Sequence, residues 1–158
     1  MRKQLIPMVV TLTSLLIGAP LSAQSASPLI GTWKLNNAKS RYDPGPPPKS
    51  QTIRWEQVKG GFRFTADGVG SQGQTTHSET MEKEDGTEAT VEGAAAPTTR
   101  ALKRIDDRTY EDADRVNGKL TVTRRLVVSP DGKAITVTVS GTNTQGQAVN
   151  NVVVYEKQ

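Results

Sequence analysis

Apolar and polar residues alternate along most of the chain after residue 28, in short runs that turn-forming residues separate. A period of two is typical of antiparallel strands that bury one face, and pairs such as Asn117-Gly118 and Asp131-Gly132 suit the tight turns between such strands. No run shows the period of an amphipathic helix. The pattern predicts ten strands joined by hairpins, over residues 29–35, 50–58, 61–67, 74–83, 87–92, 98–105, 108–116, 119–129, 133–142 and 148–157.

The last strands show the alternation most clearly. Ile135, Val137 and Val139 fall on one face of their strand, and hydroxyl-bearing residues lie between them. A long meander leaves two unpaired edges that invite aggregation, and closing the sheet on itself removes both edges. The sequence therefore predicts an all-β fold, a single antiparallel up-and-down β-barrel of about eight to ten strands, with a β-sandwich as the alternative.

The N-terminal segment has the order of a secretory signal peptide. Two basic residues precede an apolar run from Leu5 to Ile17, and small residues follow up to Ala23. The run is shorter than the ~20 residues that span a bilayer, and no later stretch is continuously apolar. We therefore expect a signal peptide over residues 1–23, a mature domain over residues 24–158 without a membrane anchor, and a periplasmic or secreted location.

Composition narrows the class of protein further. Removing 23 of the 158 residues leaves 135, enough for one ordinary domain, which we expect to be a monomer. There is no cysteine, so we expect neither a disulfide nor a lipid attached through cysteine. Without the two basic residues of the signal segment, 18 Lys and Arg stand against 16 Asp and Glu, a net charge of +2. The basic residues form no stripe, which argues against nucleic-acid binding.

Candidate catalytic and metal-binding residues are few. His77 is the single histidine, which argues against mechanisms that use a Ser-His-Asp set or a multi-histidine metal site. Its polar neighbours predict a solvated surface position, with haem ligation as the alternative. Glu111, Asp112 and Asp114 have two interpretations, a Ca²⁺ site or a solvated strand. We predict a non-enzymatic protein with no metal and no cofactor.

The first predicted strand carries Gly31 and Trp33, a spacing that resembles the G-x-W strand of lipocalins and the wider calycin barrels. This resemblance implies a barrel whose Trp closes one end and is crossed by a basic side chain from a late strand. Ten predicted strands, where lipocalins have about eight, leave a barrel of the fatty-acid-binding type open. Most of the chain resembles a group of small exported bacterial lipocalin-like proteins, through residues 31–36, the Pro-rich connector 43–48, residues 102–106, Arg124-Arg125, and Asn150-Asn151-Val152 with Tyr155.

Four aromatic residues are candidates for the interior. Trp33 is predicted to plug one end of the barrel, because an indole brings a large apolar area to a tapering end and its N–H needs a buried acceptor. Trp55, Phe62 and Phe64 have two interpretations. They line a pocket for a ligand, or they fill the core.

Arg124 is the most informative charged residue, since alternation places it on the apolar face of its strand. A buried guanidinium without a partner is costly. Three arrangements avoid this cost for Arg124. In the first, the guanidinium is satisfied within the protein, by pairing with a carboxylate or by stacking on a ring such as Trp33. In the second, a bulge in the strand turns Arg124 outward, and in the third it contacts a carboxylate of a ligand. Arg125, one residue further on, is predicted to face water.

Two functions fit these observations. The first is an exported binding module whose barrel holds a small apolar or amphiphilic ligand, with Arg124, Trp55, Phe62 and Phe64 as the candidate ligand-binding residues. The alternative is a structural or protein-interaction domain with a filled barrel and no ligand. A cavity of ~300 Å³ or more with a mouth favours the first, and side chains packed across the barrel axis favour the second.

Overall fold

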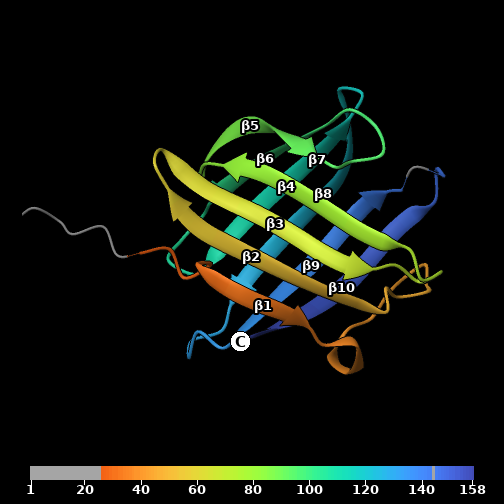
Figure 1. Ribbon diagram of the computed structural model, residues 1–158, viewed down its shortest axis with the longest axis horizontal. Helices are drawn as coiled ribbons and strands as arrows, with labels where there is room; N and C mark the ends of the chain where they lie inside the picture. The colour runs from red at the N-terminus through yellow and green to blue at the C-terminus, as the bar shows by residue number, and fades with distance from the viewer. Residues whose placement is uncertain (1–25, 144) are drawn as a thin grey trace, which may run out of the picture.

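The computed structural model describes residues 26–143 and 145–158, so the predicted signal peptide lies outside the described residues. Ten strands form one closed antiparallel barrel in chain order, and the first strand pairs with the last (Figure 1). The predicted all-β, up-and-down barrel is confirmed. The strands are β1 (Gly31–Leu35), β2 (Ser50–Val58), β3 (Gly61–Val69), β4 (Thr75–Glu82), β5 (Asp85–Glu92), β6 (Thr98–Arg104), β7 (Thr109–Val116), β8 (Lys119–Val128), β9 (Ala134–Thr142) and β10 (Ala148–Lys157).

Each predicted strand is present, and its ends differ from the predicted ends by two residues or fewer. The prediction missed one single-turn 3₁₀ helix, η1 (Asn37–Lys39), because one turn is too short to show a period. The side chain of Asn36 caps this turn by accepting a hydrogen bond from the backbone N–H of Lys39 at 3.1 Å. No helix within the described residues has both the length and the apolar character needed to cross a membrane.

The segment between β1 and β2 covers the part of β10 that β1 does not reach. Pairing of β1 with β10 involves only residues 33–35 of the first strand. Beyond them, Asn36 donates its N–H to the carbonyl of Val154 at 2.8 Å, and Arg41 forms an isolated bridge with Val152. The Pro-rich connector, residues 43–48, then leads the chain from β10, where Asn150 donates its N–H to the carbonyl of Asp43 at 2.7 Å, to the start of β2.

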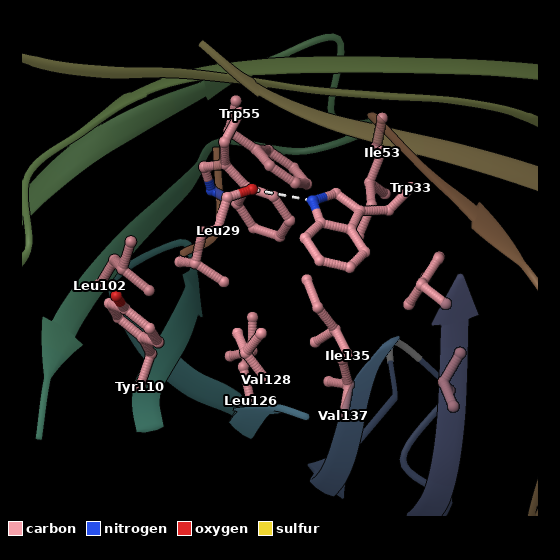
Figure 2. Packing of buried hydrophobic residues seen from close by; sticks show 14 residues of the cluster. Leu29, Trp33, Ile53, Trp55, Leu102, Tyr110, Leu126, Val128, Ile135 and Val137 are labelled. Carbon is pink, nitrogen blue, oxygen red and sulfur yellow. Dashed lines mark hydrogen bonds between the residues drawn. The ribbon is translucent and has the colours of Figure 1, made fainter. Parts of the chain in front are cut away.

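Trp33 lies at the end of the barrel where the chain enters β1. Its side chain is fully buried, and its indole Nε1 donates a hydrogen bond to the carbonyl oxygen of Leu29 at 2.8 Å (Figure 2). Leu29 belongs to the turn before β1, which folds across this end and is itself buried. We call this the closed end of the barrel.

The position of Lys157 over the Trp33 ring gives a reason for the glycine at position 31. The Lys157 ammonium lies 4.9 Å from the centroid of the Trp33 ring. Gly31 has a φ of +134°, and a Cβ added there would come within 2.9 Å of Cε of Lys157. A side chain at position 31 would therefore strain the backbone and obstruct the lysine that crosses the indole.

The apolar core fills the barrel next to the closed end. In Figure 1, β1 to β4 form the near wall and β7 to β10 form the far wall, and the buried side chains of Figure 2 come from both. These side chains form one contiguous cluster rather than separate patches. Its members closest to full burial are Leu29, Trp33, Leu102, Tyr110, Leu126, Val128 and Ile135.

Candidate functional site

The inward positions of β6, β7 and β8 change from apolar near the closed end to charged in the middle of the barrel. On β8, Leu126 belongs to the apolar core, and the next inward position is Arg124. Strand register then places Arg100 of β6 opposite Asp114 of β7, and Arg124 opposite Asp112. Opposite charges therefore meet across neighbouring strands inside the barrel.

Asp114 lies between the two guanidinium groups. Arg100 donates from Nε to Oδ1 of Asp114 at 2.7 Å and from Nη2 to Oδ2 at 3.0 Å. Arg124 donates from Nη2 to the same Oδ2 at 2.7 Å and from Nη1 to Oδ1 of Asp112 at 2.7 Å. Although burial opposes ionisation of Asp114, these hydrogen bonds hold its pKa well below the ordinary value. The carboxylate is therefore ionised at neutral pH.

Glu82, on β4, is the third carboxyl group of this interior cluster, and it is only 3% exposed. Its Oε2 accepts a hydrogen bond from the indole Nε1 of Trp55 at 3.2 Å. Its Oε1 lies 3.7 Å from Nη1 of Arg100 and has no hydrogen-bond partner among the described residues. Burial raises the pKa of Glu82 to about 7, and the charge of Arg100 opposes this shift only in part.

The raised pKa of Glu82 predicts a pH-dependent stability. The unfolded chain ionises this carboxyl near the ordinary glutamate pKa of 4.5, whereas the folded barrel keeps the proton until about pH 7. Between these values the folded state binds more protons, so the free energy of unfolding falls as the pH rises, by about 3 kcal/mol from this group. Urea unfolding at pH 5 and pH 8 measures the difference, and Glu82→Gln is expected to remove it.

Glu79 supplies the matched control for this prediction. It lies on the same strand, faces outward and pairs with Arg63 at 3.5 Å, with 38% of its side chain exposed. Glu79→Gln is expected to keep the pH dependence of the unmodified protein. If Glu82→Gln keeps it as well, Glu82 is not the group that titrates in this range.

A cavity of about 160 Å³ lies inside the barrel beside the charged cluster. One wall is charged and polar, and includes Arg100, Asp112 and Arg124. Most of the remaining lining is apolar, with side chains from both halves of the barrel: Ile53, Trp55, Phe64, Val137, Val139 and Val153. The cavity can therefore contact both an apolar group and a polar group of a ligand.

The barrel opens at the end opposite Trp33, which we call the mouth. A hollow of about 370 Å³ lies there and shares Arg100 and Ser78 with the inner cavity. The inner cavity alone is smaller than the ~300 Å³ expected of a pocket for a drug-sized ligand. The interior is thus packed at the closed end and hollow toward the mouth, a state between the two alternatives that the sequence left open.

The structure brings three of the four predicted ligand-binding residues together. Trp55, Phe64 and Arg124 line the inner cavity, and the rings of Trp55 and Phe64 lie 4.8 Å apart. Phe62 does not join them. It lies about 7 Å from Phe64 along β3, toward the closed end, and borders a surface hollow there with Ser27.

Arg124 takes the first of its three predicted arrangements, pairing with carboxylates, and its side chain is 22% exposed. It does not stack on Trp33, where Lys157 lies instead. Asp112 and Asp114 are buried, so the solvated-strand interpretation is wrong for them, and they pair with Arg100 and Arg124 rather than forming an acidic ligand set of the kind that a Ca²⁺ site needs. Their neighbour Glu111 faces outward and pairs with Arg125 at 2.7 Å, and about half of each of these two side chains is exposed.

Two further observations concern metal and haem ligands. His77 is exposed, and its Nδ1 lies 2.6 Å from Oδ1 of Asp67 on the neighbouring strand. Among the residues that the structure describes, no group of three or more His, Cys, Asp or Glu side chains is arranged to hold a metal ion.

Sequence reasoning missed Glu82 and Arg100 as interior residues. A signal was present for Arg100, because it stands two positions from Leu102, the most apolar residue of its strand. For Glu82 the signal was weaker, since Thr80 and Glu82 share the inward face of β4 and neither is apolar. Alternation alone assigns such a face only when its neighbours are hydrophobic.

The closed ten-stranded barrel is compatible with the calycin type of fold. Comparisons of the chain with protein-family models, with curated proteins and with solved structures find no match. The class of this protein therefore rests on its geometry, a closed antiparallel barrel with a charged cluster and a small cavity inside.

Proposed function

We propose that this chain is an exported, non-enzymatic barrel of the lipocalin-like type that binds one compact apolar or amphiphilic molecule in its interior. The observation that supports this most is the inner cavity of about 160 Å³, with its apolar wall and its charged wall. A protein cavity of about 150 Å³ lined by apolar side chains can hold benzene. A ligand with one aromatic ring therefore fits, and the inner cavity alone is too small for a long acyl chain.

The hollow at the mouth supports an amphiphilic ligand. Arg100 and Ser78 line both this hollow and the inner cavity. Asp114 and Asn143 also line the hollow. A molecule with its ring against Trp55 and its polar group toward Arg100 would place each part in a matching environment.

The order of residues at the N-terminus supports export, with cleavage after Ala23 and a periplasmic or secreted location. Packing around Trp33 and Gly31 supports the lipocalin-like assignment, because it gives a physical reason for the G-x-W spacing. The nearly neutral mature charge supports a partner other than nucleic acid. We propose that the protein acts as a monomer.

Native mass spectrometry of protein purified from the periplasm of its own host tests export and binding together. The expected species begins near Gln24 and carries a small non-covalent mass. Protein that keeps Met1 would contradict export. A mass equal to that of the bare mature chain in every preparation would favour the filled-barrel alternative, a structural or protein-interaction domain.

A binding measurement with a defined probe complements this experiment. Benzyl alcohol is expected to bind the purified domain with a dissociation constant on the order of 1 mM. Ala66→Met places a longer side chain into the cavity and is expected to weaken binding at least tenfold. Ala101→Met is the matched control, because Ala101 lies on β6 between two inward-facing residues and faces outward. Equal binding by both variants would exclude the inner cavity as the site.

A further inference from the structure

The charged cluster inside the barrel holds more acidic than basic groups. Two guanidinium groups face three carboxyl groups across β4, β6, β7 and β8. When all five are ionised, the cluster carries one net negative charge. The residues are Glu82, Arg100, Asp112, Asp114 and Arg124.

Both guanidinium groups are already engaged by protein carboxylates. Arg100 donates two hydrogen bonds to Asp114, and Arg124 donates one each to Asp112 and Asp114. Each guanidinium has five N–H donors and uses two of them on aspartates, so a ligand carboxylate that reached the remaining donors would lie beside Asp112 and Asp114 and would add a second net negative charge to the cluster. Bringing a like charge next to buried carboxylates is unfavourable, because the protein interior screens charges less than water does.

One acceptor atom, in contrast, remains available at the cavity wall. It is not Oε1 of Glu82, which has no hydrogen-bond partner among the described residues but is buried, and Glu82 does not line the inner cavity. Asp112 lines the inner cavity, and within the described part of the chain only its Oδ1 accepts a hydrogen bond. An ammonium group has three donors and no acceptor, so it can donate to the unused carboxylate oxygen of Asp112.

We infer that the inner cavity selects a ligand with one aromatic-sized apolar group and a primary ammonium group over the corresponding carboxylate. This inference rests on the proposed ligand-binding function and names the charge class of the ligand. Asp112 accepts hydrogen bonds from the ammonium group through its unused oxygen. The ring contacts the apolar wall at Trp55 and Phe64, and aromatic faces close to a cation add to the attraction.

Three probes of matched shape test the inference: benzylamine, benzyl alcohol and benzoate. Calorimetric titrations are made at pH 8, where the amine is protonated and Glu82 is ionised, since the pKa of Glu82 is about 7. We expect benzylamine to bind at least tenfold more tightly than benzoate, and more tightly than benzyl alcohol. Benzoate that binds as tightly as benzylamine would overturn the inference and leave the proposed function intact.

The two proposals fail in different ways. If none of the three probes binds, the proposed function fails as well. If benzyl alcohol and benzylamine bind equally, the cavity binds the ring without recognising the ammonium group, and the inference is wrong. The ratio of affinities in the unmodified protein therefore decides the question without any variant.

Asp112→Asn locates the selectivity within the cavity. It keeps an oxygen that can accept the hydrogen bond from Arg124 but removes the charge. We expect the preference for benzylamine over benzoate to fall about tenfold. Glu111→Gln, one residue away on the outer face, removes the same charge and is expected to leave the preference unchanged. An unchanged preference in a folded Asp112→Asn variant would contradict the assigned role of Asp112.

Discussion

Replacing Trp33 with alanine is expected to lower the free energy of unfolding by about 3–5 kcal/mol. The indole is fully buried, and its N–H bonds the carbonyl of Leu29, which lies in the turn across the closed end. The change therefore leaves a large cavity and an unpaired buried carbonyl together. Since a domain of this size is stable by about 5–15 kcal/mol, much of the variant will fail to accumulate as folded protein. Yield and urea denaturation measure this effect.

Leu120→Ala is the matched control for Trp33→Ala. Leu120 lies on β8 and is 48% exposed, so its removal is expected to change the free energy of unfolding by less than about 1 kcal/mol. An unfolding curve of Trp33→Ala that coincides with that of the unmodified protein would show that Trp33 does not hold the closed end together.

Arg124→Met is expected to be the second strongly destabilising change. Methionine fits an apolar interior, but Asp112 loses its guanidinium partner and Asp114 loses one of its two. Removing one member of a buried ion pair typically costs about 3–5 kcal/mol, because it leaves an uncompensated buried charge. Urea denaturation at pH 7 gives the loss directly.

Arg125→Met, at the next position of the same strand, is the control. Arg125 pairs with Glu111 on the outer face at 2.7 Å, and 51% of its side chain is exposed. Surface ion pairs of this kind contribute about 0–1 kcal/mol. A loss for Arg124→Met as small as that for Arg125→Met would show that the interior ion pairs do not stabilise the barrel.

The fold was predictable because its signals are local. Alternation marks each strand, and residues such as Asn117-Gly118 mark the turns between strands. Asn117 and Gly118 both have positive φ values, 50° and 77°, as a tight hairpin turn requires. The position of Trp33 followed from the same reasoning, since an indole on the first strand needs both a large apolar space and an acceptor.

The interior charges were harder to predict, because their meaning depends on strand register. Each of Asp112 and Asp114 by itself is typical of a solvated strand, and the inward face of β7 carries few apolar residues. Only the pairing of β6 with β7 places Arg100 opposite Asp114. Register between strands is a three-dimensional property, so alternation within one strand does not reveal it.

The central claim is that the inner cavity, and not the packed closed end, receives the ligand. The two tryptophans test it directly, because Trp55 lines the cavity and Trp33 lies in the core at the closed end. Each contributes one indole N–H signal to the proton–nitrogen correlation spectrum. On titration with benzyl alcohol, we predict that the Trp55 signal shifts and the Trp33 signal stays in place. A shift of the Trp33 signal alone, or of neither signal at saturating probe, would contradict the claim.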